Sequence, residues 1–284
     1  KTKAEKSNTR FEPTIGSGTS TLGLHLTTKA ENINFQSTNT SFYFLAISLG
    51  KLTASAKLPM KMNDGQIRTY GETRVIDYQF NFALSPQLNL EAIYQDYSGY
   101  YWQPKDSDQI YKLPELQSAR QAMNLFYSAN PEYSLAMVSQ ANWRQSEDAG
   151  SLLFGFGLQQ FSLSGEVIPT GYEANLRAGL SQASARSATL SAGYGYNWLW
   201  SHFYAGTSGL LGASFNDLEY SYGRQKTQET RFSPSFGFGF GFGYRWTTAK
   251  LGMFTRLQSW NLKFDDKELT NSTSNAAAYY SYSF

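Results

Sequence analysis

The sequence predicts an all-β protein, folded as a transmembrane antiparallel up-and-down β-barrel of about 12–14 strands. Three observations carry this prediction. Apolar and polar side chains alternate in many short segments, as they do when successive strand residues point to opposite faces. Aromatic residues make up 16% of the chain and charged residues also 16%, whereas about 25% charged residues is usual in soluble domains. One segment, residues 235–246, alternates aromatic residues with glycine.

The aromatic–glycine segment has the strictest alternation in the chain. A helix would scatter its aromatic rings on all sides and would carry four glycines, each costing about 1 kcal/mol relative to alanine. A soluble sandwich would bury the aromatic face of the strand, whereas a membrane barrel would turn it towards lipid. We expect lipid- or subunit-facing aromatic side chains at Phe236, Phe238, Phe240, Phe242, Tyr280, Tyr282 and Phe284.

Composition excludes several classes of protein. The net charge of +2 gives no case for nucleic acid as a partner, and the absence of cysteine excludes disulfides and thiol chemistry. Mean hydropathy is −0.44, and no window approaches the roughly 18 consecutive apolar residues of a membrane-spanning helix. The polar opening without an initiator methionine indicates a processed mature chain. We therefore expect a mobile leader over residues 1–17 and a single barrel domain over residues 18–284.

Alternating segments follow one another along the whole chain. In the first, Leu22, Leu24 and Leu26 share one side. Gly50 and Lys51 form a two-residue connection that joins the second and third into a hairpin. Thirteen segments are expected as strands: residues 21–29, 41–49, 52–58, 75–84, 88–94, 121–127, 133–137, 152–158, 190–198, 203–215, 236–246, 250–260 and 276–284.

The connections between these segments tend to alternate between short and long, as in membrane barrels. A barrel with both ends on one side needs an even number of strands. A further strand within residues 158–168 or 172–182 would give fourteen, and twelve remain if the first segment and one other do not span. The first long connection, residues 96–116, contains Tyr97, Tyr100, Tyr101 and Trp102. We expect an aromatic girdle there, with a ligand platform as the alternative.

Most of the chain resembles a known family, more weakly over residues 124–169 than over residues 47–102. The residues that carry the resemblance are Leu49-Gly50, Lys57-Leu58-Pro59, Tyr70-Gly71, Asp77-Tyr78-Gln79 and the run from Tyr94 to Tyr101. They are similar to an uncharacterised bacterial outer-membrane barrel family, catalogued only as a domain of unknown function. The resemblance implies a barrel in the bacterial outer membrane, and some barrels of this kind are thought to associate into rings. It supplies no catalytic residues.

The lumen-facing side of these strands carries the charged and polar side chains that the sequence marks as candidate site residues. They are Lys57, Asp77, Gln79, Glu91, Arg245 and Arg256. As pore-lining groups they would tune ion selectivity. Alternatively, they form an internal network of ion pairs that fills a closed barrel.

The glycines of residues 237–243 all fall on one face of their strand. Glycine in a strand often marks the close approach of another group, so we also predict that something bulky from the same chain packs onto this face.

Catalytic and metal sites find little support in the sequence. His25 is expected to point into the lumen. Ser201 and His202 are neighbours, whose side chains should diverge, so they are not expected to form a nucleophile–base pair. No histidines or cysteines have metal-ligand spacing, and no cofactor is expected.

Three functions follow as hypotheses. The first is a non-enzymatic outer-membrane barrel that self-associates into a homo-oligomer and organises or encloses membrane lipid. The second is a porin-like passive channel for small solutes. The third, an outer-membrane lipid-modifying enzyme, depends only on the two histidines and the many serines. Expected partners are membrane lipids, further copies of the chain and the outer-membrane assembly machinery. The C-terminal strand ending in Phe284 looks like the recognition signal for that machinery.

Overall fold

The computed structural model describes residues 11–27, 32–38, 40–105, 107–138, 145–165, 180–222, 225–264 and 267–284. Its helices are α1 (Asp64–Tyr70) and the 3₁₀ helix η1 (Leu135–Val138). The strands of the described residues are β1 (Phe11–Thr27), β2 (Asn32–Gln36), β3 (Ser41–Leu49), β4 (Leu52–Pro59), β5 (Arg74–Ala83), β6 (Leu88–Trp102), β7 (Tyr111–Ser128), β8 (Ala149–Ser164), β9 (Leu180–Trp200), β10 (Phe203–Tyr222), β11 (Gln225–Arg245), β12 (Ala249–Phe264) and β13 (Lys267–Tyr282).

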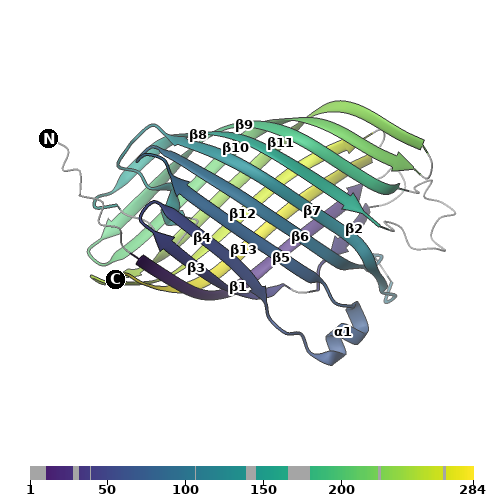
Figure 1. Ribbon diagram of the computed structural model, residues 1–284, viewed down its shortest axis with the longest axis horizontal. Coiled ribbons are helices and arrows are strands. Elements are labelled where there is room, and N and C mark those ends of the chain that lie inside the picture. Colours follow the sequence, from purple (N-terminus) through teal and green to yellow (C-terminus); the bar gives the residue numbers. More distant parts are fainter. Residues whose placement is uncertain are drawn as a thin grey trace.

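The strands form one antiparallel sheet that closes on itself, because β13 pairs with β1 (Figure 1). β2 and β3 occupy one strand position, since β2 pairs with the C-terminal part of β1 and β3 with its N-terminal part. The barrel therefore has twelve strand positions, within the predicted range. Residues 133–137, predicted as a strand, instead belong to a short segment that contains η1. Residues 158–164 continue β8, and residues 172–179 lie outside the described part.

The number of strands changes along the barrel axis. At one end the ring between β1 and β6 is completed by the short strands β3, β4 and β5. At the other end β2 pairs directly with β6, through Gln36 and Tyr101. The ring there consists of β1, β2 and β6 to β13, which is ten strands rather than twelve. α1 projects beside this step in the wall (Figure 1).

Both described chain ends lie at the wide end of the barrel, which we call the turn end. Phe284 N donates to Phe11 O at 3.0 Å, and the short connections at residues 50–51, 84–87, 201–202 and 246–248 lie at the same end. The opposite end is called the loop end. Residues 11–17 are part of β1, which corrects the predicted leader boundary at residue 17; residues 1–10 lie outside the described part. Glycines at positions 16 and 18 obscure the alternation of this strand in the sequence.

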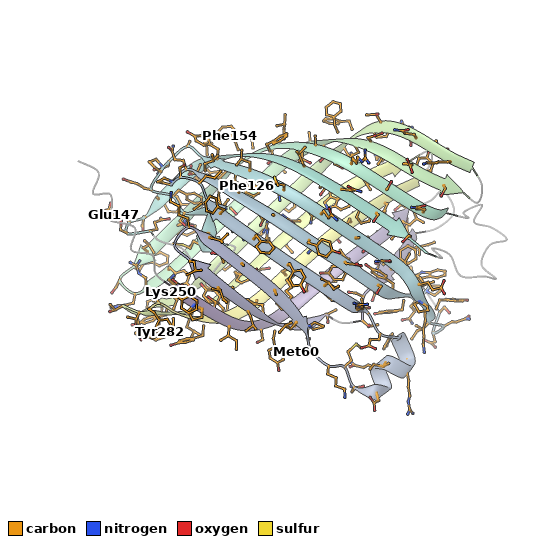
Figure 2. All side chains as sticks on the ribbon, viewed as in Figure 1. Met60, Phe126, Glu147, Phe154, Lys250 and Tyr282 are labelled. Carbon is orange, nitrogen blue, oxygen red and sulfur yellow. The ribbon has the colours of Figure 1, made fainter. Side chains whose placement is uncertain are left out.

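The strands reverse their polarity halfway along. In the turn-end half of β8, Phe154 is exposed and Ser151 buried, whereas in the loop-end half Phe161 and Leu163 are buried. Apolar side chains thus point outwards in the first half and inwards in the second. A surface in lipid is apolar and a surface in water is polar, so one strand meets two solvents. Figure 2 shows Phe154 on the outside of the barrel.

This reversal corrects two predictions. Leu24 and Leu26 point into the barrel and His25 outwards, the opposite of the predicted arrangement. Tyr100 and Trp102 belong to β6 and are buried inside, rather than forming a girdle in a loop. The sequence interpretation assumed that every apolar parity faces lipid, which fails in the half of the barrel outside the membrane. Among the described helices, none is long and apolar enough to cross a membrane.

Candidate functional site: the barrel interior

Three layers of side chains cross the interior of the barrel. The first, at the loop end, is an apolar layer that we call the loop-end core. Phe161 and Trp260, from opposite parts of the wall, meet edge to face with ring centroids 5.0 Å apart. Its members come from strands all round the ring, including β2: Leu22, Leu24, Leu26, Ile33, Phe35, Tyr97, Tyr100, Trp102, Leu113, Leu116, Phe161, Leu163, Ala183, Ala185, Leu218, Tyr220, Trp260, Leu262 and Leu269. The narrower ring at this end brings these side chains into contact across the lumen.

The second layer, the polar layer, lies at mid-height and is built from ion pairs. Lys57 Nζ and Asp77 Oδ2 are 2.6 Å apart on the adjacent strands β4 and β5. Arg256 of β12 binds Glu91 of β6 through two hydrogen bonds of 2.5 and 2.9 Å. Six steps round the ring separate β6 from β12, so this pair spans the lumen from wall to wall.

Neutral groups complete the hydrogen bonding of the two buried carboxylates. Gln95 donates to Asp77 at 3.0 Å and Tyr97 at 3.2 Å. The amide of Asn124 donates to Glu91 at 3.0 Å. Buried charges are tolerated when they are paired and when their remaining lone pairs are satisfied. The polar layer meets both conditions for its carboxylates.

All six predicted lumen residues lie on the inner wall. Besides the four charged residues of the two pairs, Gln79 donates to Asp77 at 3.3 Å. Arg245 donates to the backbone oxygen of Gln145 at 3.0 Å, nearer the turn end. Three inner charges were missed. Glu12, in the predicted leader, pairs at 2.9 Å with Lys250, the first residue of a predicted strand. Arg120 falls where the alternation is weak.

The third layer is a part of the chain that we call the inner segment, the described residues 129–138 and 145–148 between β7 and β8. It folds into the turn end of the barrel, where η1 packs against β10, β11 and β12. Met137 is buried in a cluster with Phe44, Tyr204 and Tyr279 from the wall. Asn197 of β9 donates to the backbone oxygen of Ser134 at 2.9 Å and to Gln145 Oε1 at 2.7 Å. These contacts hold the segment inside.

The glycine parity of β11 faces inwards, as predicted, but its surroundings differ along the strand. A Cβ added at Gly243 would lie 2.4 Å from Tyr204 Oη and 2.3 Å from the backbone oxygen of Leu251. The predicted bulky neighbour is therefore confirmed at this end. At Gly237 an added Cβ would meet only Leu210, at 3.8 Å. There the glycines line a cavity, and the prediction is wrong.

The outer surface carries a belt of large apolar side chains on the turn-end half. Every strand except β2 contributes at least one exposed member. Of the predicted outward aromatics, Phe238 and Phe240 are half-buried between neighbouring strands. The others, Phe236, Phe242, Tyr280, Tyr282 and Phe284, are exposed. This belt is the surface that meets lipid.

The two histidines lie outside the lumen. His25 is on the outer face of the loop-end half. Ser201 Oγ lies 3.0 Å from His202 Nδ1, although divergence was predicted. Both residues form the connection between β9 and β10, where Ser201 has a φ of 55°, so strand geometry does not apply to them. His202 also stacks on Tyr244 at 5.4 Å. Within the described residues, no group of three or more His, Cys, Asp or Glu could hold a metal ion.

A closed antiparallel barrel with an apolar outer belt defines the class: the protein is a transmembrane β-barrel. The chain belongs to the family described as a domain of unknown function, DUF4421, whose model matches residues 14–284. No curated protein matches the chain in sequence.

Several solved structures are similar to the chain over almost its whole length. The outer membrane protease OmpT from Escherichia coli is 12% identical, with 98% of both chains covered and a TM-score of 0.45. The toluene transporter TodX of P. putida is 10% identical, with 97% of this chain and 90% of that chain covered and a TM-score of 0.33. The toluene transporter TbuX of Ralstonia pickettii is 9% identical, with 96% and 89% covered and a TM-score of 0.35. At such scores these similarities add nothing to the class defined above.

Proposed function

We propose that the protein is a non-enzymatic barrel of the bacterial outer membrane with a closed lumen, which acts through its outer surface as a homo-oligomer in contact with lipid. The observation that carries the proposal is the three-layer filling of the lumen. The location is supported by the short connections and both described chain ends at one end of the barrel, the arrangement of outer-membrane barrels. We further propose that the assembly machinery recognises the C-terminal strand ending in Phe284.

The filled lumen argues against the alternative, a porin-like passive channel. A continuous water path would have to pass the Arg256–Glu91 pair, which crosses the lumen. Leaving one member of such a buried pair alone costs about 3–5 kcal/mol. The path would also have to pass the loop-end core and the inner segment. Two cavities remain in the polar region, of about 130 and 70 Å³.

Planar-bilayer recording tests the closed lumen. We expect the intact protein to insert and to give no stable open-channel current steps. A protease-protection assay on the same preparation serves as the control for insertion. Stable conductance steps from the intact barrel would contradict the closed lumen and would favour the passive channel.

Self-association is supported by the outer face of β10. Thr207 and Gly209 point outwards there, and nothing lies within 4 Å of a Cβ added at Gly209. Aromatic residues of both neighbouring strands flank these positions: Tyr196 and Tyr194 of β9 on one side, Phe240 and Phe238 of β11 on the other. These small side chains therefore lie between two columns of aromatic residues. Small residues let another strand approach closely in lipid.

The size of the protein in mild detergent tests whether it self-associates. A homo-oligomer predicts a multiple of 31.9 kDa. Gly209→Trp puts a bulky side chain between the two aromatic columns and should shift the population towards the monomer. Leu45→Trp, on the outer face of β3 and 47% exposed, is the matched control and should leave the size unchanged. A monomeric intact protein would contradict self-association.

The non-enzymatic part of the proposal is supported by the surroundings of His202. The Ser201–His202 contact is exposed, and no carboxylate is among the described partners of His202 to orient it as a base. We expect no hydrolysis of phospholipid vesicles by the purified barrel. Hydrolysis that disappears in His202→Ala would contradict this part and favour the lipid-modifying enzyme.

A further inference from the structure

The cavity of about 130 Å³ in the polar layer has two contrasting walls. One wall carries the charged side chains Glu91, Arg120 and Arg256. The facing wall, on β9 to β11, includes Leu210, Phe236 and Phe238 but no charged side chain, and its polar groups are hydroxyls set among glycines. These are Thr189, Ser191, Ser208, Ser214, Ser235, Gly237 and Gly239. The cavity has room for several waters or for an ion of a few heavy atoms.

Arg120 is a buried cation of the polar layer that forms no ion pair with a described carboxylate. It is only 8% exposed. Its guanidinium donates to two neutral amides, Gln159 Oε1 at 3.3 Å and Gln258 Oε1 at 3.5 Å, and lies 5.9 Å from the ring centroid of Trp260. No ion pair joins it to a described carboxylate, whereas Lys57, Lys250 and Arg256 each have one.

The nearest carboxylate cannot neutralise Arg120, because it is already engaged. Glu91 accepts two hydrogen bonds from Arg256 and one from Asn124. The cavity wall therefore holds two guanidinium groups and one carboxylate, an excess of one positive charge. An uncompensated charge away from water is strongly unfavourable unless an opposite charge joins it. The missing partner must be an anion small enough for the cavity.

The opposite wall supplies hydrogen-bond donors for such an anion. The hydroxyl groups of Ser208 and Ser235 have no partner within the described residues, and those of Thr189 and Ser214 lie 2.7 Å apart. The glycines between them leave the space open. A planar guanidinium facing several hydroxyl donors is the chemistry that binds carboxylate or phosphate oxygens.

We propose that this cavity is a binding site for one small oxyanion, held by Arg120 against the hydroxyl wall. Its ligand is inorganic phosphate or a short carboxylate, which share this chemistry. The site lies inside the barrel, so it is independent of self-association at the outer surface.

Equilibrium dialysis with labelled phosphate and labelled acetate tests the site. The full chain is refolded into detergent micelles in the presence of each ion, at constant ionic strength, so that the closed lumen does not block entry. We expect saturable binding of one ion per barrel. Binding of phosphate alone or of acetate alone identifies the ligand class, and either result supports the site. An intact barrel that binds neither ion saturably overturns it.

Three variants assign the binding to this cavity. Arg120→Gln removes the charge and should weaken binding at least tenfold. Gly237→Leu fills the cavity from the opposite wall without touching Arg120 and should abolish binding. This variant still tests the site if Arg120→Gln does not fold. Arg186→Gln removes an exposed arginine on the outer surface and should leave binding unchanged. Undiminished binding in Arg120→Gln or in Gly237→Leu would contradict the proposal.

Discussion

Gly237 and Gly243 belong to the same inward parity of β11 but have different surroundings. Gly243 is covered by Tyr204 and by the backbone of β12, whereas Gly237 borders the cavity. Gly243→Ala should lower the free energy of unfolding by about 1–3 kcal/mol, the usual effect of overpacking. The reason is that the new Cβ would meet the backbone oxygen of Leu251 at 2.3 Å, which has little freedom to move. Urea unfolding in detergent, followed by tryptophan fluorescence, measures the change.

Gly237→Ala is the matched control, because its Cβ would meet Leu210 at an ordinary van der Waals distance of 3.8 Å. This variant should unfold at the same urea concentration as the parent or slightly higher. Equal destabilisation by both substitutions would mean that glycine acts through backbone freedom rather than through close packing.

The Arg256–Glu91 pair permits a prediction about charge balance. Glu91→Gln removes the carboxylate that binds Arg256 and lies beside Arg120, and should lower the free energy of unfolding by about 3–5 kcal/mol. The double variant Glu91→Gln/Arg256→Gln removes one of those guanidinium charges as well. It should be more stable than Glu91→Gln alone. The parent, the single variants Glu91→Gln and Arg256→Gln and the double variant form a double-mutant cycle. Additive losses of unfolding free energy would contradict coupling across the lumen.

At the scale of elements, the inner segment is the least firmly held of the three layers. Tyr133 Oη and Asn197 Oδ1 are buried without a hydrogen-bond partner among the described residues. Asn197→Leu removes the two donated hydrogen bonds to Ser134 and Gln145 while keeping the side-chain volume similar. The segment should then leave the lumen more often. Chymotrypsin should cleave faster after Tyr133, which is only 2% exposed in the folded barrel.

Asn216→Leu is the control for that experiment, since Asn216 is equally buried but donates to neighbouring residues of the barrel wall. Cleavage after Tyr133 should be unaffected by it. An unchanged cleavage rate in Asn197→Leu would show that these hydrogen bonds do not hold the segment.

The elements also show what the sequence can predict. Strands that cross the lipid, such as residues 76–82 and 236–244, alternate strictly because their two faces meet lipid and lumen. The alternation of Tyr133, Leu135 and Met137 covers too few residues to separate a strand from a 3₁₀ turn. β2 was missed because only Ile33 and Phe35 are apolar, and because its pairing with β6 is a long-range event that no local pattern encodes.

Only part of the candidate site was predictable: the sequence shows which residues face the lumen, but not which of them contact one another. Parity alone places Asp77 and Glu91 on the inner wall. Which cation reaches which carboxylate depends on the diameter and register of the whole ring, because the partners of Glu91 come from β7 and β12. The inner segment escaped prediction for the same reason: its burial requires a lumen wide enough to receive it.

At the scale of the whole molecule, the barrel meets two solvents. The outer face of β8 is apolar at Leu152, Phe154, Phe156 and Leu158, and polar at Gln160 and Ser162. Lipid should therefore end between Leu158 and Gln160 on this strand. The loop-end half is then built like a water-soluble barrel, with an apolar core inside and a polar surface outside.

Two arginine substitutions on this one face test where the lipid ends. Phe154→Arg puts a charge in the apolar belt and should destabilise the folded barrel in lipid vesicles by about 2–4 kcal/mol, the depth-dependent effect known for barrels. Ser162→Arg, on the same face in the loop-end half, should change stability by about 0.5 kcal/mol or less because its side chain meets water. Urea-dependent folding into vesicles measures both. Equal effects of the two substitutions would contradict a lipid boundary between residues 154 and 162. Such a result would instead fit a soluble barrel, which in detergent-free buffer would bury Phe154 against another protein surface.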